Sequence, residues 1–140
     1  MPMAQIDYSP LGKAVARLKE GLEALRREPE NTLYRDGVIQ RFEFTYGLCA
    51  SMLERFLMYS APVQPEGKMT FPTLIRTASE LGLLRSGWNV WHGFREARNL
   101  TSHVYKEEVA CRVIEKVPLF AEEAEYLLMK LERTAADSDQ

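Results

Sequence analysis

Apolar residues recur along this chain at alternating intervals of three and four, the period of a helix that packs on one side. The first such stripe consists of Leu11, Val15, Leu18, Leu22 and Leu25. Ser9 before it suits an N-cap, Pro10 suits the first helical position, and Pro29 stops the pattern. We therefore expect a helix that begins at Ser9 and ends before Pro29.

The longest uninterrupted pattern predicts a second helix from about Thr32 to about Ser60. Its stripe consists of Val38, Phe42, Thr45, Cys49, Met52, Phe56 and Tyr59. At about 1.5 Å of rise per residue, this helix would span roughly 40 Å. Residues 61–70 follow with two prolines, a glycine and no periodicity, which predicts the one long loop.

Two shorter patterns come next. A third helix is expected from about Thr70 with Pro72 in its first turn, and Gly82 is placed to close it. Its inward positions are Leu74, Ile75, Ala78 and Leu81. A fourth helix carries Trp88, Trp91 and Phe94.

A fifth helix is expected from about Lys106 to about Arg133. Its buried positions are Ala110, Val113, Ile114, Val117, Ala121, Ala124, Leu128 and Leu131. Pro118 lies inside this pattern and should kink the helix, because it removes one backbone donor and crowds the carbonyl four residues earlier. The chain shows no strand pattern, repeat or domain boundary. It predicts an all-α, up-and-down bundle of about five helices in a single domain over residues 1–140, with a frayed tail at 134–140.

Composition narrows the class of protein. Hydrophobic residues make up 46% and charged residues 27%, as in an ordinary globular domain. The net charge is −2 and the pI about 5.8, so any contact with nucleic acid needs a local positive patch. No signal peptide and no long apolar run are visible, and Cys49 and Cys111 occupy apolar helical positions. We expect buried thiols in a cytoplasmic protein that does not enter a membrane.

Several kinds of catalytic chemistry are absent from the sequence. It has no glycine-rich phosphate loop and no cysteine or histidine set at metal-ligand spacing. Its four aspartates are Asp7, Asp36, Asp137 and Asp139. A two-metal nucleotidyltransferase needs carboxylates on rigid elements. We expect no metal site and no cofactor, and the chain alone should not be a nucleotidyltransferase.

The stretch RNLTSHVY, residues 98–105, concentrates polar side chains after the tryptophans. If the fourth helix is regular through residue 105, its stripe is Val90, Phe94, Ala97, Thr101 and Val104. Arg98 and His103 then lie about 140° apart and cannot hold one phosphate. If the helix instead ends near Leu100 to Ser102, His103 falls in a turn and can swing back. Spacing alone favours an arginine that satisfies helix-end carbonyls, a surface histidine, and tryptophans that serve a core or an interface.

Longer segments carry a resemblance. RFEFTYGL at 41–48, FPTLIRTASELGLL at 71–84 and SGWNVWHGFREARNLTSHVY at 86–105 occur in order. Together they resemble the nucleotidyltransferase substrate-binding proteins of the HEPN (higher eukaryotes and prokaryotes nucleotide-binding) superfamily, the small all-α, HepT-like partners of minimal nucleotidyltransferases. The resemblance covers about residues 8–133. It implies a homodimer that pairs with a separately encoded minimal nucleotidyltransferase.

The resemblance also implies site residues and two functions. In one, Arg95, Arg98, Asn99, Ser102 and His103 bind a nucleotide or polymer substrate that the subunit presents to its partner. In the other, the chain is a metal-independent ribonuclease toxin with Arg98 and His103 as catalytic residues at a dimer cleft. The partner then neutralises the toxin by attaching nucleotide to Tyr105. A purely structural dimerisation bundle would leave RNLTSHVY unexplained.

The physical argument for a dimer is that acid–base cleavage of RNA needs both a base and an acid, whereas each chain offers His103 once. Trp88 and Trp91 would also need a surface to cover them, which a second copy of the chain could supply. Arg85 and Arg95 are candidates for the local positive patch. The chain departs from the family pattern at Gly47, where an acidic residue is usual, and at Lys106, where aspartate is usual.

Overall fold

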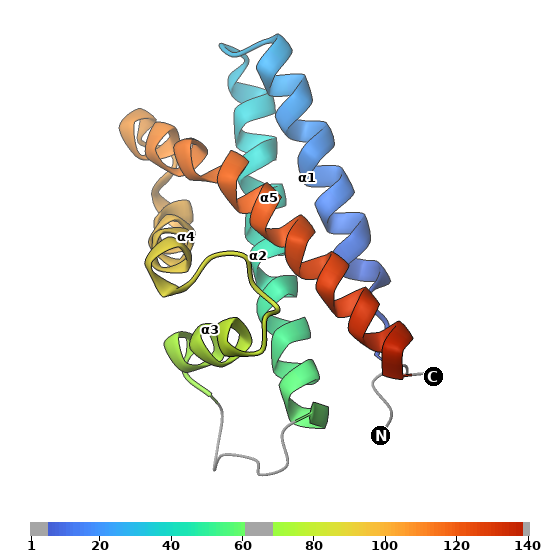
Figure 1. Cartoon of the computed structure of the whole chain (residues 1–140). Helices are drawn as coiled ribbons and strands as arrows, with labels where there is room; N and C mark the ends of the chain where they lie inside the picture. The colour runs from blue at the N-terminus through green and yellow to red at the C-terminus, as the bar shows by residue number, and fades with distance from the viewer. Residues whose placement is uncertain (1–5, 61–68, 139–140) are drawn as a thin grey trace.

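The computed structural model describes residues 6–60 and 69–138 and has five α-helices (Figure 1). They are α1 (Ser9–Arg27), α2 (Thr32–Ser60), α3 (Phe71–Glu80), α4 (Trp88–Leu100) and α5 (Glu107–Ser138), and a 3₁₀ helix, η2 (Thr101–His103), joins α4 to α5. No strand occurs within 6–60 or 69–138. The all-α helical bundle predicted from the sequence is confirmed. Most of the expected loop, residues 61–68, lies outside the described residues.

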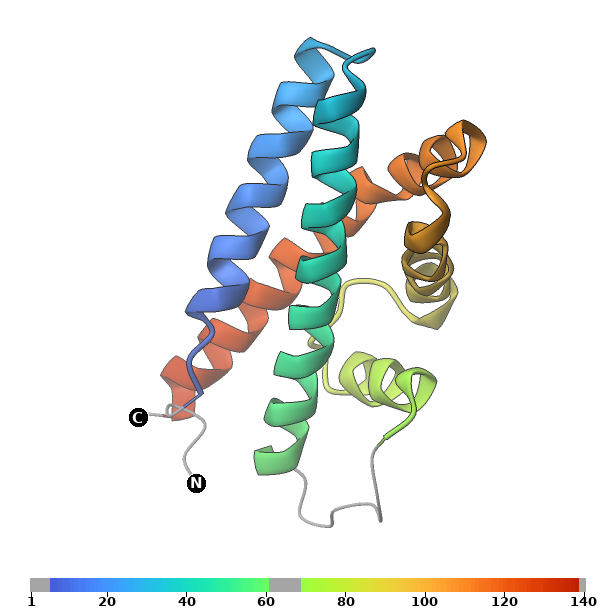
Figure 2. The ribbon, with the colours of Figure 1, turned by 180° about the vertical axis from the view of Figure 1, so that it is seen from behind.

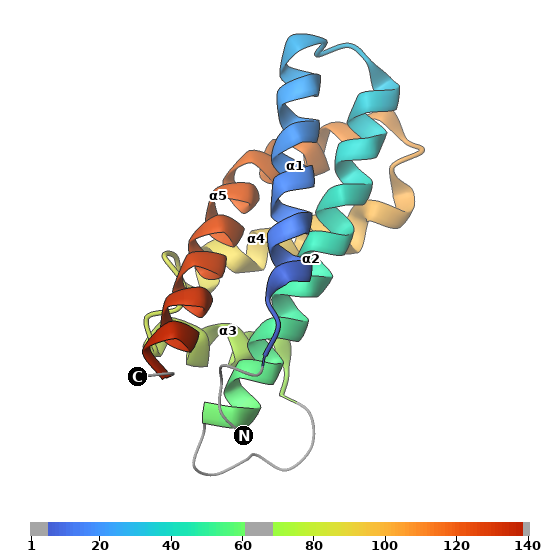
Figure 3. The same ribbon diagram turned by 90° about the vertical axis from the view of Figure 1, so that its right-hand side faces the viewer.

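The helices form two groups. α1 and α2 make an antiparallel hairpin, and α5 packs across both of them. α3 contacts α2 and α4, and α4 contacts α2 and α5, on the side away from α1 (Figures 2 and 3). No helix in the described part of the chain combines the length and the apolar composition needed to span a bilayer.

An aromatic cluster fixes α4 against α2 and α5. The ring of Phe120 on α5 packs edge-on against Phe42 of α2 at 5.0 Å and against Phe94 of α4 at 5.2 Å. Trp91 lies 5.1 Å from Phe94 and is 1% exposed. Such edge-to-face pairs add to the free energy gained from burying their large apolar area. The candidate site therefore rests on a helix whose inner face is fully packed.

The residues at the ends of α1 and α3 can be compared with those expected from the sequence. Tyr8, not Ser9, occupies the N-cap of α1, and the amide of Ser9 donates to Asp7 Oδ1 at 2.9 Å. The expected Ser9 cap is therefore wrong by one residue. Thr70 does cap α3 by accepting from the Thr73 amide. Gly82 closes it at φ 76°, a left-handed conformation that glycine adopts without strain.

Some expected core positions are on the surface. Leu81, which follows the last turn of α3, is 55% exposed, and Tyr59 near the end of α2 is 43% exposed. Cys49 is buried as expected, but Cys111 is exposed. The prediction of two buried thiols is therefore wrong for Cys111, because the packed face of α5 runs through Val109, Ala110 and Val113 instead.

α5 contains Pro118, and Figure 2 shows that the ribbon of this helix bends along its length. Proline lacks an amide hydrogen, so the Ile114 carbonyl loses its intrahelical donor. α5 is therefore bent as expected, and the position of the bend at Pro118 stays a prediction. The helix continues through Ser138, beyond the expected end near Arg133. Fraying of 134–140 stays a prediction.

A buried carboxylate links the α3–α4 connection to α5. Glu123 is 1% exposed, and it accepts from Arg85 Nε at 2.7 Å and from the Ser86 amide at 3.1 Å. Arg85 also lies 3.5 Å from Glu122. These contacts satisfy a charge that would be costly to bury alone. They also hold the segment that leads into α4.

Candidate functional site

The RNLTSHVY stretch begins as helix and ends as a turn. α4 stops at Leu100, and the chain tightens into η2 before α5 begins at Glu107. The buried Thr101 hydroxyl donates to the Arg98 carbonyl at 2.7 Å. This side-chain bond occupies a carbonyl near the helix end and favours termination. Of the two alternatives left open by the sequence, the helix that ends near Leu100 is the one observed.

Arg98 is bound on two sides. Its Nη1 donates to the Thr101 hydroxyl at 3.1 Å and lies 3.5 Å from Glu43 Oε2 on α2. Its side chain is still 43% exposed. The Arg98 side chain thus contacts a hydroxyl at the end of α4, not the helix-end carbonyls that the structural interpretation expected, and it also presents guanidinium donors to solvent. Glu43 lies within the RFEFTY motif, but helical spacing gave no sign that it would meet Arg98.

Tyr46 brings Arg95 into the same neighbourhood. Burial raises the pKa of Tyr46 to about 12, and the positive charges of Arg95 and Arg98 act against this rise. Both arginines therefore lie within electrostatic range of the Tyr46 phenol. Arg95 also stacks over Phe71, with its Cζ 5.7 Å from the ring centre. Arg95 and Arg98, three residues apart on α4, form the positive part of the candidate site.

The turn after α4 gathers a second set of groups. His103 and Tyr105 are exposed, Tyr105 to 77%, and their rings meet edge-on at 6.4 Å. Lys106 Nζ lies 5.9 Å from the centre of the Tyr105 ring. Asn99 and Ser102 are exposed as well. The phenol of Tyr105 is therefore accessible, with an imidazole and an ammonium group beside it.

In the described part of the chain, the arginine pair Arg95 and Arg98 on α4 is not hydrogen-bonded to His103 in η2 or to Tyr105 of the turn. Arg85 is also not part of the positive patch, because Glu122 and Glu123 hold it. The expectation that Arg85 adds to that patch is wrong. Trp91 needs no cover from a partner, because it is buried in its own chain.

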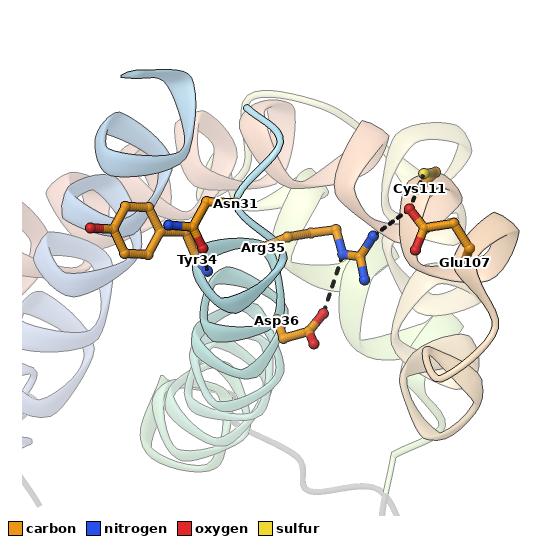
Figure 4. A network of polar contacts seen from close by, with 6 residues as sticks. All are labelled: Asn31, Tyr34, Arg35, Asp36, Glu107 and Cys111. Carbon is orange, nitrogen blue, oxygen red and sulfur yellow. Dashed lines mark hydrogen bonds and ion pairs between the residues drawn. The ribbon is translucent and has the colours of Figure 1, made fainter. Parts of the chain in front are cut away.

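Figure 4 shows the polar contacts that join the start of α5 to α2. Arg35 on α2 donates to Glu107 Oε1 at 2.7 Å and to Asp36 Oδ1 at 3.2 Å, and its side chain is only 14% exposed. Glu107 is the first residue of α5 and lies two positions after Tyr105. The hydrogen bond from Arg35 lowers the pKa of Glu107. This contact fixes the end of the turn to α2, and the sequence gave no sign of it.

The described part of the chain contains no group of three or more histidine, cysteine, aspartate or glutamate residues placed to hold a metal ion. Of the D-x-D pair in the tail, Asp137 lies in the last turn of α5 and Asp139 lies outside the described residues. Gly47 is exposed on α2, and a Cβ added there would meet nothing within 4 Å. An acidic side chain at that position would therefore have room.

Comparisons with known proteins agree with this architecture. A family model described as "Nucleotidyltransferase substrate binding protein like" matches residues 6–133. The chain belongs to this family. A Haemophilus influenzae relative described as probable ribonuclease HepT is 35% identical over 96 residues, which cover 68% of this chain. Those residues span 65% of the relative's own length.

Solved structures of the family have the same fold. A Haemophilus influenzae protein, described as revealing the fold of a substrate-binding domain of a nucleotidyltransferase, superimposes with a TM-score of 0.82 and 28% identity. The match covers 90% of this chain and 99% of that protein. A Thermus thermophilus protein gives a TM-score of 0.72 and 31% identity over 86% and 98% of the two chains.

Proposed function

We propose that this chain is the substrate-binding subunit of a two-component nucleotidyltransferase system and binds the phosphates of a nucleotide or RNA at the end of α4. Membership of the nucleotidyltransferase substrate-binding family supports the proposal that the chain works with a separately encoded minimal nucleotidyltransferase. The observation that carries the proposal is Arg98. It is anchored by Thr101 and still 43% exposed, with Arg95 beside the same tyrosine.

The chemistry fits an anionic ligand. A guanidinium offers planar paired donors that match two phosphate oxygens, and anchoring at the helix end reduces the side-chain entropy lost on binding. Asn99, Ser102 and His103 supply hydrogen-bond donors on the adjacent exposed surface. The nucleotidyl transfer itself belongs to the partner in this proposal.

The test is the binding of ATP and of RNA to Arg98→Ala, measured by titration calorimetry. We expect binding to weaken about tenfold or more, as for the loss of a charge-assisted contact. The melting temperature should change little, because an ion pair as accessible to solvent as that of Arg98 with Glu43 contributes little to stability. Arg17→Ala on α1 is the matched control, since it removes an exposed arginine of the same charge. Unchanged affinity in Arg98→Ala would contradict the proposal.

The exposure of His103 and Tyr105 favours a second candidate, a metal-independent ribonuclease toxin acting as a homodimer. One His103 would take the proton of a ribose 2′-hydroxyl as its oxygen attacks the adjacent phosphorus. The His103 of a second copy would give a proton to the departing 5′-oxygen, leaving a 2′,3′-cyclic phosphate. Arg98 would stabilise the charge that develops on the phosphorus oxygens. The name of the Haemophilus influenzae relative, probable ribonuclease HepT, supports this candidate.

In this candidate Tyr105 is the point of neutralisation. Its phenol oxygen would lose a proton and attack the α-phosphorus of ATP, and pyrophosphate would leave. Intact mass spectrometry after incubation with the partner, ATP and Mg²⁺ separates the two functions. The toxin predicts added adenylate on the wild type and none on Tyr105→Phe, together with growth arrest when the chain is expressed alone. If an active partner adds no mass to the wild type, the toxin function is contradicted and the substrate-binding function stands.

A further inference from the structure

Two arginines on α3 and α4 lie over aromatic rings. The Cζ of Arg76 is 5.9 Å from the centre of the Trp88 ring, and the Cζ of Arg95 is 5.7 Å from that of Phe71. The rings of Phe71 and Trp88 are themselves 6.0 Å apart. We call Arg76, Trp88, Phe71 and Arg95 the arginine–aromatic row. Within the described residues, neither guanidinium forms an ion pair or a hydrogen bond.

This arrangement leaves the arginines ready for an anion. An arginine stacked on a ring loses rotamer freedom while the N–H donors at its edge stay available, and it sheds its hydration easily. Arg85, between the two helices, shows the contrast, because Glu123 occupies it. Phe71 and Trp88 are only partly buried, so the row is not enclosed by the core.

The row continues toward the candidate site. The Tyr46 ring lies 5.4 Å from Phe71, and the charges of both Arg95 and Arg98 act on the Tyr46 phenol. Two acidic groups near this path have polar partners. Glu43 pairs with Arg98, and Glu96 lies 3.2 Å from His92. Arg76 and Arg95 therefore present their charge on the rings in a chain whose net charge is −2.

We propose that the arginine–aromatic row binds single-stranded RNA and leads it to Arg98. This rests on the proposed function and deepens it, because it assigns a polymer as the substrate class. The two arginines lie on different rings, so a ligand that uses both must extend past at least two aromatic side chains. A single strand repeats a phosphate and a base along its length, so two of its phosphates can meet the arginines at the ends of the row while bases lie against the rings between them. A mononucleotide has no second base to place.

The test compares short fluorescent single-stranded RNA with ATP as probes of the full-length chain. The double variant Arg76→Gln/Arg95→Gln should bind RNA about tenfold more weakly and show a shallower dependence of affinity on salt, because fewer counterions are released. ATP binding should fall less than RNA binding in the double variant, because Arg95 also belongs to the phosphate site at the end of α4. In Arg76→Gln, which spares that site, RNA binding should weaken and ATP binding should be unchanged. The control Arg17→Gln/Arg133→Gln removes two exposed arginines from α1 and α5 and should leave both affinities unchanged.

A second variant separates charge from stacking. Arg76→Lys/Arg95→Lys keeps the charge, so it should retain the salt dependence and recover part of the RNA affinity. Circular dichroism melting confirms that each variant is folded. Wild-type RNA affinity in the glutamine variant overturns the proposal, and so does an equal loss of ATP and RNA binding. A change in sedimentation coefficient would also overturn it, because the row would then be a contact between copies of the chain.

The result for Arg98→Ala distinguishes this proposal from the proposed function. If Arg98→Ala loses both ligands while the row variants lose none, the row is excluded and the phosphate site at the end of α4 stands. If the row variants lose RNA while Arg98→Ala keeps both ligands, the row binds RNA and the proposed role of Arg98 fails.

Discussion

Arg98 Nη1 and Glu43 Oε2 lie 3.5 Å apart, so the candidate phosphate-binding cation already has an anion next to it. The two side chains are 43% and 37% exposed. Ion pairs this exposed stabilise a protein by only about 0–1 kcal/mol. A phosphate can therefore displace the Glu43 carboxylate at low cost, although that carboxylate also repels the phosphate.

Glu43→Gln should strengthen binding of ATP or RNA, because it removes that repulsion while keeping a similar shape. We expect the dissociation constant to fall by a factor of about 2–5, in line with about 1 kcal/mol or less for an exposed charge. Titration calorimetry at low salt measures it. Glu132→Gln, at the far end of α5, changes the net charge equally and should have no effect. Weaker binding in Glu43→Gln would show that Glu43 instead holds Arg98 in its binding orientation.

Arg35→Ala should lower the melting temperature by roughly 3–6 °C at pH 7, since it removes the ion pair that ties the start of α5 to α2. The effect should depend on pH. Arg35 lowers the folded-state pKa of Glu107 below its ordinary value of 4.5, so the stabilisation is present above that pH. It is lost as the pH falls through the folded pKa. The wild type and the variant should therefore converge in stability in acid, as measured by circular dichroism. A difference that stays constant down to pH 3 would argue against the pair.

Gly47→Ala should stabilise the chain by about 0.5–1 kcal/mol, because glycine inside a helix costs that much relative to alanine. The added methyl group meets open space. Gly82→Ala is the informative opposite, since it forces alanine into φ 76° and should destabilise by about 1–2 kcal/mol. Urea unfolding gives both values. Destabilisation by Gly47→Ala would mean that the exposed face of α2 is covered by something else.

Stability should decline in alkali because burial raises two pKa values. The pKa of Cys49 rises from 9.0 to about 12, and that of Tyr46 rises from 10.0 to about 12. Their contribution is fully present below pH 9 and is lost as the pH rises toward 12, since the unfolded chain ionises first. Cys49→Ala should make this decline shallower between pH 9 and 11, by up to about 1.4 kcal/mol per pH unit.

Thiol labelling provides the accompanying control. At pH 8 a disulfide reagent should modify the exposed Cys111 and leave Cys49 unreacted until urea is added. Labelling of both thiols in the folded chain would show that the Cys49 region opens readily.

Helix positions were predictable where local signals agreed. The bounds of α2, Thr32–Ser60, match the expectation because a long stripe lies between Pro29 and the following loop. Gly82 closes α3 as expected because few other residues adopt its backbone angles. Ser9 did not become the cap of α1, because Asp7 accepts from its amide and draws Tyr8 into that position.

Contacts between distant helices could not be read from periodicity. Nothing in the sequence indicates that Glu123 is buried. Which face of α5 its side chain occupies depends on how the helix is rotated and bent against its neighbours. For the same reason the pairing of Arg98 with Glu43 was not foreseen, although both belong to recognisable motifs. The sequence showed that Trp91 lies at helical spacing from Trp88 and Phe94. It could not show whether its own chain or a second copy would bury it.

The missing hydrogen bond at Pro118 divides α5 into two arms of unequal length. A helix bends most easily where its hydrogen-bond ladder is interrupted. The short arm begins at Glu107, directly after the turn with His103 and Tyr105, and Arg35 on α2 holds that first residue. Any tilt of the short arm about Pro118 would therefore have to break the contact between Arg35 and Glu107.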